Sequence, residues 1–237
     1  LHGSIESERA WLGDYTNVTN IGLYAIDIVA AWELDLIGPE EARTRLDRTL
    51  TTLERLETHH GFFFNYYDTT TLERTSNFLS FVDSAWLTAG LMVVRNSVPE
   101  LAARCTHLIE REDYRFFYDP VEQLMMHGYY VHLPHRSEYS YGLLYSEARL
   151  GSLIAIGKGE APVEHWYRMA RTFPAHFDWQ SQAPKSRADK TVNGFTFPGG
   201  YYSWKGLKYL PSWGGSLFEA LMPLLVLDEL RYAPASL

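Results

Sequence analysis

The chain has 237 residues, enough to bury a substantial core, and 46% of them are hydrophobic, which excludes an intrinsically disordered protein. Its formal net charge of −8 argues against a nucleic-acid partner and against an anionic membrane surface, since both need a basic face. No apolar run reaches the roughly 18 residues of a transmembrane helix, so we expect no membrane insertion. The compartment and the oligomeric state stay open.

Aromatic residues make up 15% of the chain, including 16 Tyr and 7 Trp. Rings with a polar edge suit a groove that stacks on hydroxylated ligands such as sugars, although aromatic cores are also common. The single cysteine, Cys105, rules out an internal disulfide and is expected to be a buried, inert thiol.

The first half of the chain predicts paired helices. A helix is expected over residues 19–36 with Thr19 as its cap, and a second over 39–58, where leucines recur against a charged face. Residues 61–75 lack a helical period and predict a loop or short strand.

A Ser-x-x-Asp capping box at Ser80–Asp83 predicts an almost uncharged helix that ends near Arg95. Pro99 opens a further helix that runs to about Glu110. The following stretch, residues 113–142, is rich in Tyr, His and Phe and shows no sustained period.

The stretch from Tyr139 to Arg171 joins a tyrosine-rich segment to an isolated acid, Glu147, and then to an apolar helix that ends at Gly157. Pro162 predicts the start of another helix.

Residues 172–211 predict a long loop rich in Gly and aromatic residues, a length that usually indicates function. A second capping box, Ser216–Glu219, predicts a last helix through Leu227. About seven helices result, and charged amphipathic helices alternate with almost uncharged ones. That alternation is typical of helical hairpins in two concentric layers, so the expected class is mainly α.

Three motifs in this order resemble the glucoamylase-like domain of bacterial cyclic β-1,2-glucan synthases and related endo-β-1,2-glucanases. They are FNYYDTTTLERTSNFLSFVDSAWLTAGL (64–91), YGLLYSEARLGSLIAIGKGEAPVEHWYRMAR (141–171) and SWGGSLFEALMPLLVL (212–227). The resemblance implies a single domain over residues 1–237 with an (α/α)6 toroid of helical hairpins. It also implies carboxylate chemistry on β-glucans, with no metal or organic cofactor.

Two features depart from this family. Six hairpins need more helices than the chain shows, and the family continues with a further C-terminal segment. We therefore expect either a fragment or an incomplete toroid.

Glycoside hydrolysis usually requires a general acid and a second carboxylate. Glu147 is the candidate general acid, and Asp83 or Glu219 the second carboxylate. Each acid also has a structural interpretation without catalysis. Glu147 suits the positive end of the helix dipole, and Asp83 and Glu219 occupy the fourth position of a capping box.

Further residues are candidates for contacts with a sugar. Each also has a structural interpretation that involves no sugar. Asp68 could form a turn, Glu138 could be a solvated surface acid, and the aromatic residues could pack in the core. Arg149 is a candidate partner for an acid of the site, although its position on the helix does not face Glu147. The candidate substrate-binding residues are Tyr67, Asp68, Trp86, Glu138, Tyr139, Tyr141, Arg149, Trp204 and Trp213.

The function predicted from these residues and the resemblance is hydrolysis or transglycosylation of a β-glucan, with β-1,2 linkages favoured. The expected partner is an oligo- or polysaccharide. The main alternative is a non-catalytic glucan-binding domain or fragment. A glycoside phosphorylase is a third hypothesis, although the sequence shows no clear phosphate-binding cluster. Histidines at 59, 60, 127, 132 and 135 suggest a metal, but no ligand spacing supports one.

Overall fold

The computed structural model describes residues 2–3, 10–11, 13–174, 177 and 182–232. These residues group into two compact units. The N-terminal unit contains residues up to 112 together with 130–134, and the C-terminal unit contains 113–129 and the residues from 135 onward. Each unit is described by itself.

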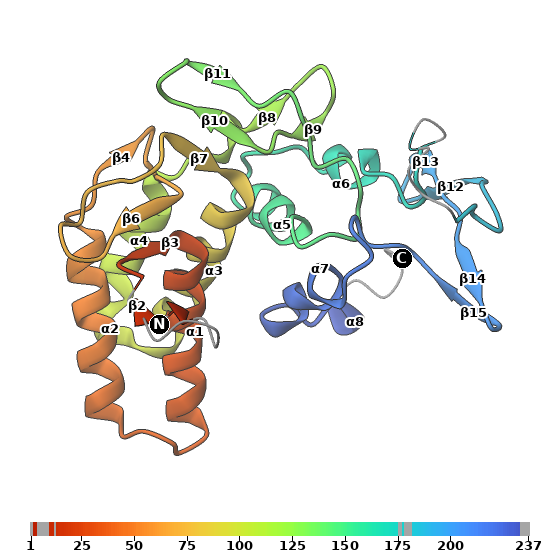
Figure 1. Ribbon diagram of the computed structural model, residues 1–237. Helices are drawn as coiled ribbons and strands as arrows, with labels where there is room; N and C mark the ends of the chain where they lie inside the picture. The colour runs from red at the N-terminus through yellow and green to blue at the C-terminus, as the bar shows by residue number, and fades with distance from the viewer. Residues whose placement is uncertain (1, 4–9, 12, 175–176, 178–181, 233–237) are drawn as a thin grey trace. The chain divides into compact units, whose positions relative to one another are not determined.

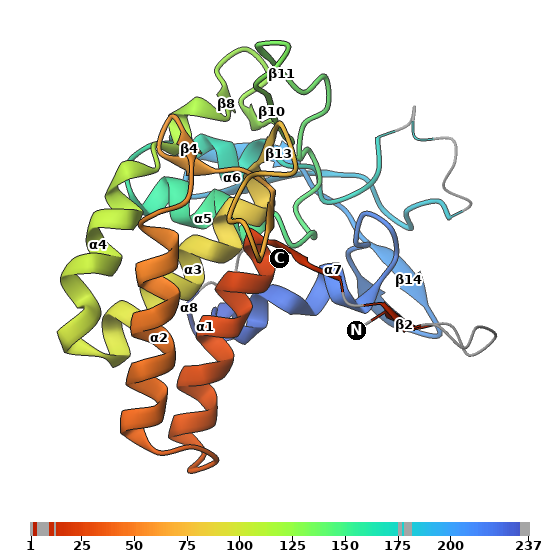
Figure 2. The same ribbon diagram turned by 60° about the vertical axis from the view of Figure 1, so that its left-hand side comes forward.

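Two helical hairpins form the N-terminal unit (Figures 1 and 2). Its helices are α1 (Val18–Glu33), α2 (Pro39–Leu53), α3 (Phe81–Ser97) and α4 (Ala102–Arg111), the last preceded by the 3-10 turn η1 (Pro99–Leu101). The four helices expected here are therefore confirmed, with ends that differ by a few residues. The cap of α1 is Asn17, whose side chain accepts from the Asn20 N–H, and not Thr19.

The pairing of α1 with α3 depends on two glycines. A Cβ added at Gly90 would lie 2.4 Å from the Gly22 carbonyl oxygen, and one at Gly22 would lie 2.3 Å from the Trp86 carbonyl oxygen. The two backbones therefore touch where these glycines meet, because only glycine leaves room for so close an approach. This contact joins the two almost uncharged helices of the unit.

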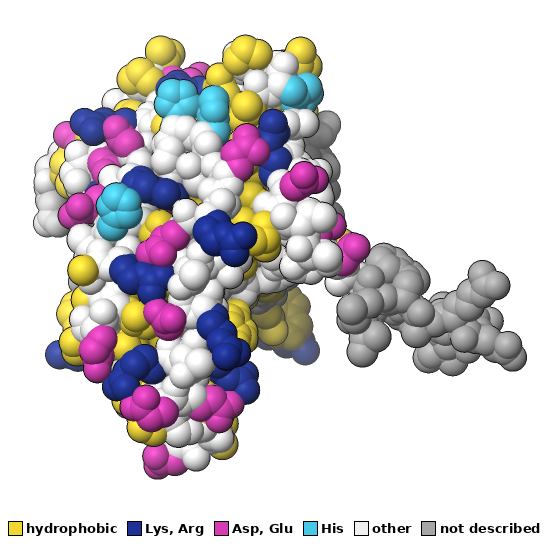
Figure 3. All heavy atoms as spheres, turned by 90° about the vertical axis from the view of Figure 1, so that its left-hand side faces the viewer, with side chains coloured by type: hydrophobic (Ala, Val, Ile, Leu, Met, Phe, Trp, Pro, Cys, Tyr) yellow, Lys and Arg dark blue, Asp and Glu magenta, His cyan; other side chains and the backbone are white. Residues whose placement is uncertain are grey.

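Helices α2 and α4 carry the charged surface of the unit. Arg104 on α4 reaches Asp47 at 2.6 Å and Glu54 at 2.7 Å on α2. Figure 3 shows acidic and basic side chains interspersed over this face. Leucines of α2 and Cys105, Leu108 and Ile109 of α4 are buried beneath it. Burial raises the Cys105 pKa to about 11, as expected for an inert thiol.

Short strands connect the helices of this unit. They are β1 (His2–Gly3) paired with β2 (Ala10–Trp11), β3 (Tyr15–Asn17) with β6 (Tyr66–Asp68), β4 (Thr58–His59) with β5 (Phe62–Phe63), and β7 (Phe78–Ser80). The β3–β6 pair places the segment before α1 beside the loop that carries Asp68. The prediction of a loop or short strand over residues 61–75 is confirmed.

The C-terminal unit has short helices and many short strands. Its first elements are η2 (Tyr114–Phe116), β8 (Tyr118–Asp119), β9 (Leu124–Met125), β10 (Gly128–Tyr130) and β11 (His135–Arg136), followed by α5 (Arg149–Gly157) and α6 (Glu164–Arg168). Strand β10 ends at Tyr130, which belongs to the N-terminal unit. Residues 113–142, which show no sustained period, thus contain short strands, among them the antiparallel pair of β8 and β9. The sequence did not predict these strands.

Two hairpins and a final helical segment complete this unit. They are β12 (Asp189–Val192) with β13 (Phe195–Pro198), β14 (Tyr202–Trp204) with β15 (Leu207–Tyr209), α7 (Leu217–Leu221), η3 (Met222–Leu225) and α8 (Glu229–Tyr232). The region predicted as one long loop therefore contains two hairpins within its described part. The sequence shows few strand signals, because strands of two to four residues are too short to show a period.

The expected hairpin layers are present in part. Within the N-terminal unit the uncharged helices α1 and α3 pair with each other, and the amphipathic helices α2 and α4 lie against them. The full ring of six hairpins stays a prediction, as does the single domain over residues 1–237.

Candidate functional site

Glu147 lies in the turn that leads into α5 and is half-buried. Its carbonyl accepts the Leu150 N–H at 3.2 Å, so the residue is fixed to the first turn of the helix. The predicted position at the mouth of an apolar helix is therefore confirmed. Here the partial positive charge of the helix N-terminus favours a carboxylate.

Arg149 is 1% exposed and connects this turn to the C-terminal helices. Its Nε and Nη2 form a bidentate pair with the Glu229 carboxylate at 2.6 and 3.2 Å. Its guanidinium also lies 4.6 Å above the Tyr145 ring. The sequence predicted that Arg149 pairs with an acid of the site. It also predicted that this acid is not Glu147, because the two side chains do not lie on the same face of a helix. The partner is Glu229, and because the two residues lie 80 positions apart, no local pattern in the sequence indicated the pair.

The remaining donors of Arg149 bind backbone carbonyls next to Glu147 and in α7. Nη1 donates to the carbonyls of Ser146 at 2.9 Å and Glu219 at 3.2 Å, and Nη2 donates to Ala220 at 2.8 Å. The peptide group before Glu147 and the peptide group after Glu219 therefore bind the same nitrogen. Arg149 therefore holds the turn before α5 beside the second half of α7.

The Glu219 side chain supports the loop that precedes α7. Its Oε2 accepts the Gly214 N–H at 2.7 Å, while its own N–H donates to the Ser216 hydroxyl at 3.2 Å. The serine half of the predicted capping box is confirmed. The carboxylate, however, binds the residue next to Trp213.

An aromatic cluster surrounds His127 in the same unit. The His127 ring lies 4.2 Å from Tyr141, 6.0 Å from Tyr139 and 6.4 Å from Trp213, measured between centroids. Three of the predicted stacking residues thus come together, with Glu138 exposed beside them. Tyr139 is 69% exposed and offers a ring to a ligand.

His127 is a member of this cluster that the sequence suggested only as a metal ligand. Its Nε2 is buried and has no hydrogen-bond partner in the part of the chain that the structure describes. Burial lowers its pKa, so the ring is neutral at pH 7. Among the described residues, no group of three His, Cys, Asp or Glu side chains is placed to hold a metal ion.

Two other predicted stacking residues differ sharply in exposure. Trp204 on β14 is 58% exposed, and the Lys205 amino group lies 4.4 Å from its ring centroid. Trp86 is 1% exposed within α3, where its carbonyl touches Gly22. Trp86 therefore packs in the core, which was the alternative to stacking on a sugar ring.

Tyr67 and Asp68 belong to the N-terminal unit and line a cavity of about 450 Å³ between the 66–72 loop and helices α1 and α2. The Tyr67 hydroxyl donates to the Glu57 carbonyl at 2.6 Å, and burial raises its pKa. Asp68 Oδ1 accepts the N–H groups of Thr70 and Thr71, both at 2.7 Å, and the Thr71 bond chiefly lowers its pKa. Asp68 therefore stabilises a turn, which was the structural interpretation of this residue.

Asp83 joins the starts of α1 and α3 in the N-terminal unit. Its Oδ1 accepts from Asn17 Nδ2 at 2.8 Å and from the Thr19 hydroxyl at 2.6 Å. Oδ2 has no hydrogen-bond partner within the described ranges. One oxygen thus ties two helices, and the other makes no hydrogen bond to a described residue.

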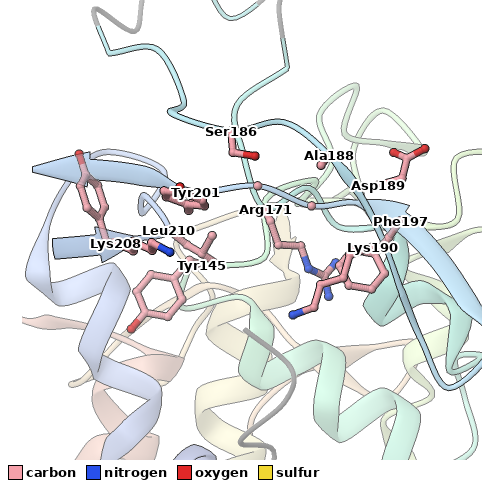
Figure 4. Close-up of a pocket in the computed structure, with 13 residues that line it drawn as sticks. Tyr145, Arg171, Ser186, Ala188, Asp189, Lys190, Phe197, Tyr201, Lys208 and Leu210 are labelled. Carbon is pink, nitrogen blue, oxygen red and sulfur yellow. The ribbon is translucent and has the colours of Figure 1, made fainter. Parts of the chain in front are cut away.

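Two adjoining cavities lie in the C-terminal unit and share Tyr145, Tyr209 and Leu210. The smaller, about 390 Å³, is bordered by Ser216 and Ala220 of the α7 segment. The larger is about 790 Å³ and is bordered by residues of β12, β13 and β15 (Figure 4). Neither wall includes the Glu147 side chain.

Solved structures with this arrangement of helices include an endo-β-1,2-glucanase from Chitinophaga pinensis, in complex with sophorotriose and glucose. It matches with a TM-score of 0.58 at 15% identity, over 81% of this chain and 46% of its own. A protein from Bacteroides fragilis assigned as a glucoamylase matches with a TM-score of 0.60 at 14% identity, over 89% of this chain and 48% of its own. The fold is glucoamylase-like.

A curated relative points the same way. Cyclic β-(1,2)-glucan synthase NdvB of Rhizobium meliloti is 24% identical over 94% of the chain, which spans 12% of the synthase. The chain thus spans under half of each glucoamylase-like structure and a small part of the synthase. No family model matches it. None of the described helices is long and apolar enough to cross a bilayer.

Proposed function

We propose that this glucoamylase-like chain acts on a β-linked glucan, with β-1,2 linkages favoured, as a hydrolase or transglycosylase. The names of the relatives support the substrate class, since two of them act on or make β-1,2-glucans. The observation that carries the proposal is the Arg149 side chain, which binds the peptide groups next to both Glu147 and Glu219.

Glu147 is the proposed general acid, which donates its proton to the leaving glycosidic oxygen. Glu147 is half-buried in the turn before α5, and a general acid must reach the oxygen that it protonates. The second carboxylate takes a proton from the attacking water in hydrolysis, or from a sugar hydroxyl in transglycosylation.

Two residues compete for this second role. Glu219 is favoured because Arg149 binds its carbonyl and the carbonyl of the residue before Glu147 within one unit. Asp83 is favoured because its Oδ2 makes no hydrogen bond to a described residue and because two donors fix its orientation. Tyr139, Tyr141 and Trp213 would supply the flat surface on which sugar rings stack.

The test is to incubate the chain, beside the natural gene product, with linear β-1,2-glucan and to measure new reducing ends and product sizes. Glu147→Gln should reduce turnover by about 100-fold or more, the usual contribution of a general acid. Glu164→Gln, an exposed acid of the same unit, is the matched control. Equal turnover by Glu147→Gln and the control would contradict the role of Glu147.

Asp83→Asn and Glu219→Gln then separate the two candidates for the second carboxylate. The variant that loses turnover to the same degree as Glu147→Gln, while it still binds the glucan, identifies that residue. Loss in neither variant would mean that the second carboxylate lies elsewhere.

A non-catalytic glucan-binding module is the second candidate function, favoured by the exposed Tyr139 ring beside Tyr141. It predicts saturable glucan binding without new reducing ends. Binding that is lost in Tyr139→Ala and retained in Glu147→Gln, with no turnover in any preparation, would support this alternative.

A further inference from the structure

Arg171 is a buried cation of the C-terminal unit that the proposed glucan chemistry does not use. It is 3% exposed and follows α6. Its Nη1 donates to the carbonyls of Trp166 at 3.0 Å, Tyr167 at 3.3 Å and Met169 at 2.5 Å. Its Nε and Nη2 have no hydrogen-bond partner anywhere in the described chain.

The two unpaired nitrogens share one edge of the guanidinium. Their N–H bonds point the same way and match two oxygens of one phosphate or carboxylate group. Although burial lowers the Arg171 pKa to about 10, the group is still a cation at neutral pH. A buried cation with an unused donor edge is costly unless something pairs with it.

Arg171 lines the cavity of about 790 Å³, whose wall holds two more cations, Lys190 and Lys208. The β12–β13 register explains where Lys190 lies. Lys190 is opposite Phe197, whose ring centroid is 4.2 Å from the Arg171 guanidinium carbon. Opposed residues of an antiparallel pair share a face, so Lys190 extends toward the same side as Arg171, as Figure 4 shows.

One acid, Asp189, also lines the cavity but does not neutralise this group. Since successive residues of a strand point to opposite faces, Asp189 points away from the face that carries Lys190. In Figure 4 its carboxylate is turned away from the Arg171 guanidinium. Three cations and one acid thus line the cavity, and the acid is turned away from the Arg171 guanidinium.

We propose that this cavity binds a phosphate group, with the Nε–Nη2 edge of Arg171 as the bidentate donor and Lys190 and Lys208 as additional charges. Tyr145, Tyr201 and Tyr209 in the wall would contact the rest of the ligand. The site is independent of the proposed glucan chemistry, because neither Glu147 nor Glu219 lines it. Both Arg171 nitrogens are closed to solvent in this conformation, so binding includes a local shift of the wall.

The phosphate has two sources with the same chemistry, free inorganic phosphate and a phosphorylated sugar. Isothermal titration calorimetry of the 237-residue chain, at fixed ionic strength in phosphate-free buffer, compares inorganic phosphate, glucose 6-phosphate and glucose. Both anions should bind, and glucose should not bind at this site. Tighter binding of glucose 6-phosphate would identify a phosphorylated sugar as the ligand, and equal or tighter binding of phosphate would identify the free anion.

Lys190→Met is the first variant, because Lys190 is exposed on a hairpin and its loss should leave folding unchanged. It should weaken binding of both anions about tenfold. Lys205→Met is the matched control, since it removes one exposed positive charge of the same unit outside the cavity and should change binding by less than about twofold.

Arg171→Met, where it folds, should abolish binding. The proposal is overturned if neither anion binds at millimolar concentration, or if Lys190→Met and Lys205→Met weaken binding equally. It is also overturned if folded Arg171→Met binds as the unaltered chain does.

Discussion

Helices α3 and α7 begin with the same local pattern, a serine followed three residues later by an acid. Ser80 accepts the Asp83 N–H at 3.3 Å, and Ser216 accepts the Glu219 N–H at 3.2 Å. In neither case does the described carboxylate return to the serine N–H, which would complete the capping box. Asp83 binds side chains of α1, and Glu219 binds the loop that carries Trp213.

The two helices differ in what surrounds them. In α3, 11 of 17 residues are buried, and in α7 no residue is buried. Asp83 therefore ties together helices that a core already holds, whereas Glu219 and Arg149 position a short helix through backbone contacts. The same capping pattern thus begins a buried helix in one unit and a helix without buried residues in the other.

The largest effect is expected from the core that supports α3. Gly90→Ala should lower the free energy of unfolding by about 3 kcal/mol, because its Cβ would meet the Gly22 backbone and force α1 and α3 apart. Urea unfolding followed by circular dichroism measures this loss. Gly157→Ala in α5 is the control, since nothing lies within 4 Å of its Cβ, and it should be neutral or stabilising. Similar losses in both variants would contradict the close approach of α1 to α3.

Removal of the two acids should separate their roles. Asp83→Ala should cost about 2 kcal/mol of unfolding free energy, because Asn17 and Thr19 lose a charged acceptor. Glu219→Ala should cost about 1 kcal/mol or less, because a single bond to a loop is lost. Asp83→Asn keeps an oxygen acceptor and should recover part of the loss. A larger loss in Glu219→Ala than in Asp83→Ala would reverse the comparison.

The serine caps should show a smaller contrast. Ser80→Ala should cost about 1 kcal/mol, because Ser80 is buried and its cap serves a long helix. Ser216→Ala should cost about 0.5 kcal/mol, because the residue is exposed and α7 has five residues. Midpoints of urea unfolding for the two variants, measured side by side, test this order.

The smallest change is expected from pH. Burial lowers the pKa of His165, so the folded ring is neutral. Its Nδ1–H donates to the Gln123 carbonyl, and its Nε2 accepts from the Ser152 hydroxyl. The unfolded chain then binds more protons below its ordinary pKa of about 6.5, and stability falls as pH is lowered through 6.5 toward the folded pKa. Above pH 7 this contribution does not change with pH.

Urea midpoints between pH 7 and 5.5 measure that dependence. His165→Gln should flatten the slope, and His107→Gln, on the exposed face of α4, is the control. An unchanged slope in His165→Gln would mean that other groups cause the loss of stability.

Much of the N-terminal unit could be predicted from the sequence. The leucine spacing of α2, the proline at its start and the serine before α3 act within one turn of helix, so their effects are visible locally. The C-terminal unit was harder, because strands of two to four residues carry no period and depend on partners elsewhere in the chain.

In the candidate site, too, the local features could be predicted from the sequence and the long-range contacts could not. By itself the sequence determined Glu147 at the mouth of an apolar helix and the serine caps before Asp83 and Glu219, because caps and helix ends are local. Only the tertiary structure decided that Arg149 pairs with Glu229, that His127 lies among three aromatic rings, and that two buried nitrogens of Arg171 have no partner among the described residues. Those contacts join residues far apart in the chain, and a side chain's partner at that distance is set by packing and not by neighbouring sequence.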